Sequence, residues 1–312
     1  MKRCLVVPLI VLAISFAVPT FGQQAKDLVG TWTLVSITLE KDGQTTDMYG
    51  ANPQGQLMFD ANGRISLVLT HSDLPHFASN NRQAGTPEEY KAVVQGSLAY
   101  FGTYSVNETD KTIVTHFESS TFPNFNGTER KESFSISGDK LNITILTKPS
   151  TGSGTARLVW KRAKEETVAP TAKDLMGTWA LVSISLETDG KTTTDFYGPN
   201  PMGQVMYDAS GHYIETVLRS DLPRFASNNR TTGTPEENEA VVHGSLAQFG
   251  TYSVNDADKT FTVHVEGCTF PNWKGTERKY RYTVSGDEFR FTTISKASTG
   301  TGIAHLVWKR VK

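Results

Sequence analysis

The sequence has very little cysteine, which excludes two kinds of small scaffold. Only Cys4 and Cys268 occur among its 312 residues, and neither belongs to a CxxC or CxxH pattern. A disulfide framework needs paired cysteines, and a structural zinc site needs four ligands at regular spacing. We therefore predict neither a disulfide framework nor a metal site, and we interpret Cys268 as a small, half-buried apolar side chain.

The common catalytic signatures and an excess of charge of one sign are also missing. There is no Gly-x-Ser-x-Gly elbow, Walker loop, dinucleotide fingerprint or His-Glu-x-x-His pattern, so the usual hydrolase, nucleotide and zinc-protease functions lack a motif. Lys plus Arg number 31 and Asp plus Glu 32, a formal net charge of −1. Binding to nucleic acid or an anionic membrane would need a basic patch. We predict no cofactor and no nucleic-acid partner.

Long apolar runs are absent after the first 22 residues. Residues 1–22 carry Lys2 and Arg3, then an apolar run over 5–18, then small residues at Thr20 and Gly22. This order is typical of a cleaved signal peptide, and the run is shorter than the roughly 20 residues that a membrane span needs. We predict a secreted or periplasmic protein with no membrane span after cleavage. An uncleaved N-terminal anchor is the alternative.

What the sequence does contain is a long internal repeat. Residues 72–105 return as residues 220–253, with 27 of 34 positions identical. A repeat of that length is a duplicated domain, because solenoid units recur every roughly 20–50 residues. We predict a first domain over 26–162 and a second over 173–312. The charged, proline-bearing segment 163–172 between them is typical of an exposed linker.

Apolar and polar side chains alternate through most of each copy, which favours antiparallel strands. Turn residues such as Asp42-Gly43 and Gly138-Asp139 separate the alternating runs. Eight or nine short strands with one apolar face favour a closed up-and-down barrel, since closure leaves no exposed edge. We predict an all-β fold of two tandem barrels. In the first copy the expected strands cover 30–39, 44–49, 55–60, 63–70, 100–107, 111–119, 127–137, 140–147 and 154–161.

One short helix interrupts the strands of each copy. The run Thr86-Pro87-Glu88-Glu89 supplies a threonine N-cap, a proline at the first helical position and a glutamate at the third, which is a capping box. The second copy repeats the pattern at 234–237, and apolar residues follow at helical spacing in both. We expect each helix to lie near the mouth of its barrel.

Both copies begin with Gly-Thr-Trp, at 30–32 and 177–179, and end with Trp-Lys-Arg. Together with the motifs between these ends, they resemble the lipocalin-like domain family of bacteria and fungi over nearly the whole of both copies. The resemblance implies a barrel in which Arg162 and Arg310 pack over the first-strand tryptophans, and it implies no particular activity. A tandem departs from the usual single domain. The shared motifs are Asn-Pro-x-Gly-Gln (52–56, 200–204), Asp-Leu-Pro (73–75, 221–223), His-x-Glu (116–118, 264–266), Phe-Pro-Asn (122–124, 270–272) and Gly-Thr-Glu-Arg (127–130, 275–278).

Two arginines are candidate ligand anchors. Arg130 shares strand parity with apolar residues, and Arg278 shares it with Tyr280 and Tyr282, so these side chains are expected to face the barrel interior. An inward arginine could hold a carboxylate or enolate oxygen with two hydrogen bonds. In the alternative, the arginines reach solvent or pair across strands with Glu118 or Glu266.

The repeated His-x-Glu motifs are the candidate catalytic groups. His116 and Glu118 share one face of their strand, as do His264 and Glu266, and a histidine beside a carboxylate can act as an acid or base. The apolar alternates Phe261, Val263 and Val265 favour an outward direction for the second pair. The interior catalytic role and the external pairing role both stay open, as does a bulge near 122–124 that would reverse the parity.

The loop before each helix offers further polar groups at the barrel mouth. Asn81 and Arg82 end the Ser-Asn-Asn-Arg run of the first copy, and Asn229 and Arg230 end that of the second. These side chains could contact a ligand as part of a lid. Alternatively, they satisfy backbone groups of the loop itself, which we favour.

Differences between the copies are informative where the fold is shared. If several of the differing residues line a cavity, the two barrels hold different ligands or only one is active. The pairs, first copy then second, are Leu67 and Glu215, His71 and Arg219, Tyr90 and Asn238, Tyr100 and Gln248, and Phe125 and Trp273.

These observations leave three hypotheses for function. The first is a binding protein that holds a small apolar or amphipathic molecule in one or both barrels. The second is a cofactor-free isomerase or cyclase that uses a His-x-Glu pair inside the cavity. The third is an interaction module with solidly packed barrels. The lining of each barrel distinguishes among them.

Overall fold

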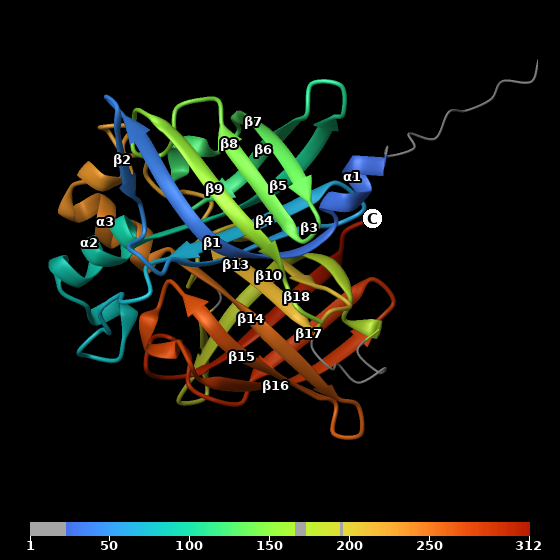
Figure 1. Cartoon of the computed structure of the whole chain (residues 1–312). Coiled ribbons are helices and arrows are strands. Elements are labelled where there is room, and N and C mark those ends of the chain that lie inside the picture. Colours follow the sequence, from blue (N-terminus) through green and yellow to red (C-terminus); the bar gives the residue numbers. More distant parts are fainter. Residues whose placement is uncertain (1–22, 166–172, 194–195) are drawn as a thin grey trace, which may run out of the picture.

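The computed structural model describes residues 23–165, 173–193 and 196–312. The predicted signal peptide and residues 166–172 of the predicted linker lie outside this range. The described chain forms two antiparallel β-barrels that lie against each other, with helices α2 and α3 side by side at one end of the pair (Figure 1).

The first barrel closes through a pairing of its first and last strands. The strand order is β2-β1-β3-β4-β5-β6-β7-β8-β9, and β1 also pairs with β9, so that eight strands form the closed barrel. The ninth strand, β2, pairs only with the last residues of β1. The elements are α1 (Gln23–Leu28), β1 (Gly30–Lys41), β2 (Gln44–Asp47), β3 (Gln54–Phe59), β4 (Arg64–Thr70), η1 (Arg82–Ala84), α2 (Pro87–Gly96), β5 (Ser97–Asn107), β6 (Thr112–Ser120), η2 (Pro123–Phe125), β7 (Glu129–Ser137), β8 (Lys140–Ile145) and β9 (Thr155–Arg162).

The second barrel repeats this topology strand for strand. Its order is β11-β10-β12-β13-β14-β15-β16-β17-β18, closed by β10 and β18. The elements are β10 (Gly177–Thr188), β11 (Lys191–Thr193), β12 (Met202–Tyr207), β13 (His212–Leu218), η4 (Arg230–Thr232), α3 (Pro235–His243), β14 (Ser245–Asn255), β15 (Thr260–Cys268), η5 (Pro271–Trp273), β16 (Glu277–Ser285), β17 (Glu288–Thr293) and β18 (Ile303–Arg310).

The predicted all-β fold is confirmed, and each of the nine strands expected in the first copy is present. Both capping boxes form, with the Thr86 and Thr234 hydroxyls accepting from the backbone of Glu89 and Glu237. Several strand boundaries lie one or two residues from the expected positions, and the start of β5 lies three residues earlier than expected. β5 begins at Ser97 instead of residue 100, because Ser97 already pairs with Thr70 of β4.

One end of each barrel is closed around its first-strand tryptophan. Trp32 and Trp179 are fully buried. The Arg162 guanidinium lies 4.1 Å from the centre of the Trp32 ring, and that of Arg310 lies 3.9 Å from the Trp179 ring. The cation–π contact implied by the resemblance is therefore present at this end of both barrels, leaving the other end as the mouth.

The two barrels share an apolar interface made by the outer faces of six strands. Strands β4 and β13 are buried along almost their whole length, because one face of each points into its own barrel and the other meets the neighbouring barrel. The interface side chains are Met58, Val68 and Ala99 from the first domain, and Met206, Ile214, Ala247 and Phe249 from the second.

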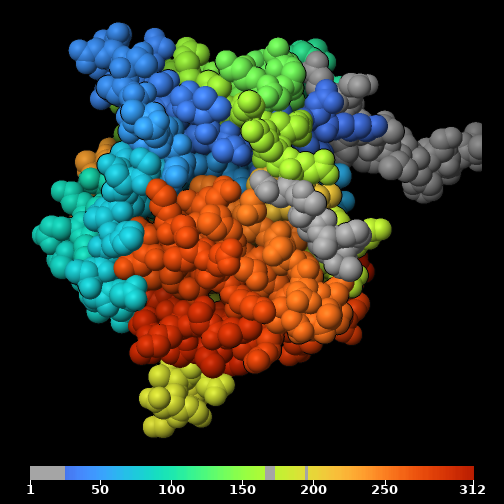
Figure 2. Space-filling view, turned by 60° about the horizontal axis from the view of Figure 1, so that its bottom comes forward, coloured from blue at the N-terminus to red at the C-terminus, as the bar shows by residue number. Residues whose placement is uncertain are grey.

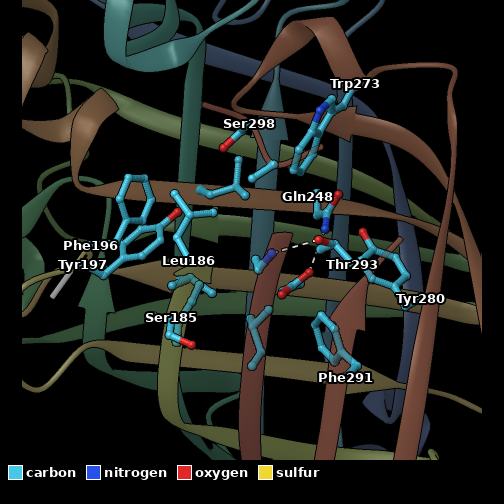
Figure 3. A pocket seen from close by; sticks show the side chains of 17 residues that line it. Ser185, Leu186, Phe196, Tyr197, Gln248, Trp273, Tyr280, Phe291, Thr293 and Ser298 are labelled. Atoms are coloured by element: carbon cyan, nitrogen blue, oxygen red, sulfur yellow. Dashed lines mark hydrogen bonds between the residues drawn. The ribbon is translucent and has the colours of Figure 1, made fainter. Parts of the chain in front are cut away.

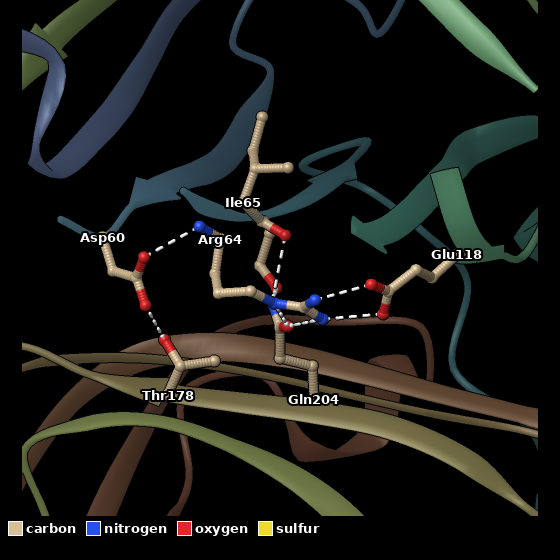
Figure 4. Close-up of polar contacts among 7 residues, drawn as sticks. Asp60, Arg64, Ile65, Glu118, Thr178 and Gln204 are labelled. Carbon is tan, nitrogen blue, oxygen red and sulfur yellow. Dashed lines mark hydrogen bonds and ion pairs between the residues drawn. The ribbon is translucent and has the colours of Figure 1, made fainter. Parts of the chain in front are cut away.

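Polar contacts cross this interface reciprocally. Figure 4 shows the set around Gln204, which includes an extra ion pair between Arg64 and Glu118. Gln56 donates to the backbone oxygen of Tyr213 at 2.8 Å, and its counterpart Gln204 donates to that of Ile65 at 3.0 Å. Gln204 also accepts from the Arg64 guanidinium at 2.9 Å, and Arg64 in turn binds Glu118 at 2.7 Å.

The motifs shared by the copies supply other reciprocal bonds. Thr31 of the first Gly-Thr-Trp donates to Asp208, and Thr178 of the second donates to Asp60. Asn124 binds the backbone N–H and C=O of Phe225 at 2.8 and 2.9 Å, while Asn272 binds those of Phe77 in the same way. Residues that serve as family signatures thus hold the two domains together here. Figure 2 shows the first domain's loop and helix region lying directly against the second domain.

The asymmetry around the two glutamines gives the first prediction. We expect Gln204→Ala to lower the free energy of unfolding by about 2–4 kcal/mol, because it removes both the acceptor that Arg64 uses across the interface and the donor to the Ile65 backbone oxygen. Gln56→Ala removes one such bond and should cost about 1–2 kcal/mol. Urea denaturation measures both, with exposed Gln44→Ala as the control. An equal or larger effect of Gln56→Ala would contradict the assignment.

Candidate functional site

A largely apolar cavity of about 50 Å³ lies inside the second barrel (Figure 3). Phe196 and Tyr197, which precede β12, border it on one side, and Trp273 of η5 borders it on another. Phe291 of β17 and Leu306 of β18 complete the apolar wall. A buried water occupies about 10–15 Å³ by the same measure, so the cavity has room for roughly three to five atoms of that size.

The equivalent cavity of the first barrel measures about 20 Å³, and an ion pair fills the space beside it. The Arg130 side chain forms an ion pair with Glu132 at 2.8 Å and donates to the Tyr100 hydroxyl at 2.7 Å. Its guanidinium also lies over the rings of Phe117 and Phe125. Every charge of this network has a partner, so the first barrel is close to solidly packed.

Three exchanges change the buried polar groups inside the second barrel. Glu215 occupies the position of Leu67, Gln248 that of Tyr100, and Tyr280 that of Glu132. Each barrel therefore keeps one buried glutamate and one buried arginine. In the first barrel the two charges sit two residues apart on β7, whereas in the second the glutamate is on β13 and the arginine on β16.

Glu215 is the most perturbed carboxyl group inside the second barrel. Gln248 Nε2 donates to it at 2.7 Å. Burial raises the pKa of Glu215 to about 7, and the hydrogen bond from Gln248 and the charge of Arg278 lower it only in part. Near neutral pH the side chain is therefore present both as a carboxylic acid and as a carboxylate.

Arg278 lies at the edge of the cavity instead of inside an ion pair. Its guanidinium stacks on the Trp273 ring at 3.6 Å and donates to the backbone oxygen of Lys296 at 2.8 Å. Outside this pair lies a surface groove of about 250 Å³, which includes Asn80 from the first domain. Trp273 and Ala297 border both the groove and the cavity, so the two spaces adjoin.

Two buried polar atoms near the cavity have no hydrogen-bond partner among the described residues. They are Oε1 of Gln248 and Nε of Arg278. Buried polar groups in folded proteins are almost always paired. An unpaired acceptor that belongs to a cavity-lining side chain is a feature of a binding site.

Arg82 and Arg230 bind the opposite domain, a placement that the sequence did not predict. Arg82 is 1% exposed and donates to Tyr197 and Ser298, both at 2.8 Å, which line the second barrel's cavity. It also donates to the backbone oxygens of Val242, His243 and Ser245 at the end of α3. Arg230 makes the reciprocal set with Tyr49, Ser150, Val94, Gln95 and Ser97. Each mouth is completed by the other domain.

The neighbouring asparagines serve the loop. Asn81 accepts from the backbone N–H of Gln83 and caps η1, and Asn229 accepts from that of Thr231 and caps η4. These contacts match the loop-satisfying alternative. The geometry places neither asparagine among the residues that line the cavity.

The two tyrosines predicted to face inward differ in environment. Tyr280 lines the cavity, and burial raises its pKa to about 12, although nearby Arg278 and Gln248 lower it in part. Tyr282 donates to Asp256 at 2.6 Å and packs against Phe261 and Phe289 away from the cavity. Of the pair, only Tyr280 can contact a molecule held there.

The His-x-Glu motifs lie on the outside of the barrels. Opposite Gly102 of β5 the β6 ladder skips Glu118, which is a β-bulge, and β15 has the same bulge at Glu266. Gly102 is required there, because a Cβ would lie 2.0 Å from the His116 backbone oxygen. His116 and His264 are exposed and line neither cavity. This placement gives no support to proton transfer inside a barrel, and Glu118 serves the domain interface instead.

Part of this site was visible in the sequence. Glu215, Gln248 and Trp273, three of the residues that differ between the copies, all line the larger cavity. Sequence reasoning missed the exchange of Glu132 for Tyr280, although aligning the two copies places these residues at equivalent positions. No local pattern could have revealed Tyr197, because its role depends on Arg82 from the other domain.

Two further features of the described residues bear on function. No group of three or more His, Cys, Asp or Glu side chains in the described part of the chain could hold a metal ion. Within the same ranges no helix is long and apolar enough to cross a membrane. Cys268 is buried more completely than expected, and burial raises its pKa to about 12, so its thiol stays protonated.

Both barrels are closed and eight-stranded, and each has an arginine over its first-strand tryptophan and a cavity toward its mouth. These features define the class of lipocalin-type barrels. The chain belongs to the lipocalin-like domain family, whose model matches residues 29–163 and again residues 176–311. This confirms the resemblance. The fold is a ligand-binding one. No curated protein matches the sequence significantly.

The solved structures that match this chain are distant in sequence. A protein of unknown function from Nostoc punctiforme is 10% identical over 91% of this chain and 96% of its own, with a TM-score of 0.24. A candidate outer membrane protein from Bacteroides fragilis is 12% identical over 92% and 98%, with a TM-score of 0.25. The REP1-NXSQ fatty acid transporter is 11% identical over 45% and 99%, with a TM-score of 0.24. Similarity at this level transfers no function.

The buried carboxyl group makes stability depend on pH. The folded state holds the Glu215 proton up to about pH 7, whereas the unfolded chain releases it near 4.5, so stability falls as the pH rises between these values. Glu215→Gln removes the effect. We expect the variant to gain roughly 3 kcal/mol over the parent protein between about pH 5 and about pH 8. Urea denaturation at both pH values measures it, and a constant difference would refute the assignment.

The reciprocal arginines give a further prediction about stability. Lysine cannot reproduce the forked contacts of Arg82, so we expect Arg82→Lys to lower the free energy of unfolding by about 3–5 kcal/mol. Arg230→Lys should cost a similar amount because its contacts are equivalent. Exposed Arg281→Lys is the control. Losses below about 1 kcal/mol would show that these buried contacts do not hold the domains together.

Proposed function

We propose that the protein is an exported binding protein that holds a small amphipathic molecule in its second barrel. The observation that carries this proposal is the contrast between the two interiors. The first barrel contains a completed Arg130–Glu132 ion pair beside a cavity of about 20 Å³. The second has an open cavity of about 50 Å³ that carries an unpartnered acceptor on Gln248.

The dimensions suit a ligand that uses two adjoining spaces. Its polar head would occupy the cavity, and its remainder would pass Trp273 into the groove of about 250 Å³. Their combined volume of roughly 300 Å³ is at the lower end of the usual range for small-molecule sites. Arg278, which we predicted as the anchor of the ligand's polar end, would instead form part of the entrance together with Trp273.

The other two hypotheses, an interaction module with packed barrels and an isomerase or cyclase, have unequal support. The first barrel fits the packed-interior alternative and serves mainly to complete the mouth of the second. The position of the His-x-Glu pairs outside the barrels offers no observation in favour of an isomerase or cyclase. Export rests on residues 1–22 of the sequence alone.

Binding of hexanol to the chain without residues 1–22 tests the proposal. We expect saturable binding with a Kd of about 1 mM or tighter, which corresponds to about 0.6 kcal/mol for each of the seven non-hydrogen atoms of hexanol. Calorimetry measures it, and quenching of Trp273 fluorescence locates it. The other four tryptophans are fully buried, and Trp273→Phe removes the reporting ring.

Variants of the lining assign the binding to one barrel. Glu215→Leu/Gln248→Tyr/Tyr280→Glu gives the second barrel the buried polar groups of the first and should abolish binding, as should Ala304→Leu, which fills the cavity. Leu158→Met in the first barrel should leave it unchanged. Absence of saturable binding to the parent protein, or binding that survives both changes in the second barrel, would overturn the proposal.

A further inference from the structure

Resting on the proposed function, we propose that the second barrel selects a neutral carboxamide or lactam head group, which Gln248 and Glu215 bind side by side. The two side chains are joined by the bond from Gln248 Nε2 to Glu215 Oε2 at 2.7 Å. They stand opposite each other on adjacent strands, β14 and β13. Both line the cavity, so they present one continuous polar edge to it.

That edge has an unused acceptor and an available donor. Gln248 Oε1 is unpaired and needs an N–H or O–H from a ligand. A protonated Glu215 carries an O–H that can donate to a ligand oxygen. A carboxamide offers an N–H and a C=O on one carbon, which is the complement of this edge. Its three polar-head atoms match the roughly three to five atoms that the cavity can hold.

The balance of charge argues against an ionic head. While Glu215 is protonated, the lining offers no charge in direct contact with an ionic head, because Arg278 stacks on Trp273 and donates to the Lys296 backbone oxygen at the edge of the cavity. A ligand carboxylate would face Glu215, and a ligand ammonium would face Arg278 at the entrance. A neutral head avoids both costs.

The protonation of Glu215 should control affinity. Six ionisable groups act on Glu215 or respond to it: Tyr197, Tyr207 beside β13, Tyr213, Cys268, Arg278 and Tyr280. Burial raises the pKa of the four tyrosines and of the cysteine, so none of them changes charge near neutral pH. Arg82 lies beyond Tyr197, to which it donates, and His243, whose pKa burial lowers, lies outside the cavity lining. Glu215 is therefore the group that titrates at the site, and its pKa is about 7.

A set of six- and seven-carbon probes tests the inference by calorimetry. Hexanamide and 2-heptanone have the same shape, but the ketone lacks the N–H. We expect hexanamide to bind at least about tenfold tighter at pH 6, because one buried hydrogen bond is worth about that factor. Hexanoate and hexylamine should bind more weakly than hexanamide. An amide that binds no tighter than the ketone, or an ion that binds tighter than the amide, overturns the inference.

Two variants and the pH dependence separate recognition from simple packing. Raising the pH from about 6 to about 8.5 should weaken hexanamide about tenfold or more, since the donor proton is lost. Glu215→Gln mimics the protonated acid, so it should keep the affinity and remove the pH dependence. Gln248→Met should lose the preference over the ketone, because it removes the acceptor of the amide N–H. A Glu215→Gln variant that keeps the parent pH profile overturns the role of Glu215.

The two levels of the proposal fail in different ways. If hexanol and 2-heptanone bind but hexanamide has no advantage, the second barrel is a binding site without the proposed selectivity. If none of the probes binds, the proposed function itself falls, and the selectivity falls with it.

Discussion

The burial of two guanidinium groups is the constraint on which the arrangement of this protein depends. A buried arginine must find acceptors for its donors, because an unpaired charge in the interior is strongly unfavourable. Arg82 and Arg230 each find theirs at the helix end and mouth of the opposite domain, where carbonyl oxygens carry partial negative charge. Since each mouth includes a tyrosine held by the other domain's arginine, Tyr197 in one and Tyr49 in the other, neither barrel is complete alone.

The contacts of the two arginines are symmetric, but the buried glutamate lies on a different strand in each barrel, β7 in the first and β13 in the second. The first barrel keeps Glu132 beside Arg130, and the pair fills the space that a ligand would need. In the second barrel the acid sits on another strand, as Glu215, and Arg278 turns toward Trp273. The number of buried charges is unchanged, but their separation leaves room between them. Three exchanges thus replace a paired ion network by the polar edge of a cavity.

The sequence was sufficient for the fold because its information is local. Alternating apolar residues, turn dipeptides and the Thr86 capping box each depend on near neighbours, and all of them formed as expected. The site was only partly predictable because it depends on distant partners. Differences between the copies pointed to Glu215, Gln248 and Trp273, whereas the trans contacts of Arg82 involve residues more than 100 positions away. The bulge at Glu118 was likewise invisible, because it depends on how two strands pair.

The tandem arrangement explains how one barrel can tolerate an unfavourable acid. In a dimer of identical chains both interiors would carry Glu215, and each would lose stability as the pH rises. Joining two unequal copies confines that cost to one barrel, while the packed interior of the other and the reciprocal interface keep the whole stable. Functional sites are commonly the least stable parts of a fold. Here the less stable interior is also the one with the larger cavity, and its mouth is held by the more solidly packed domain.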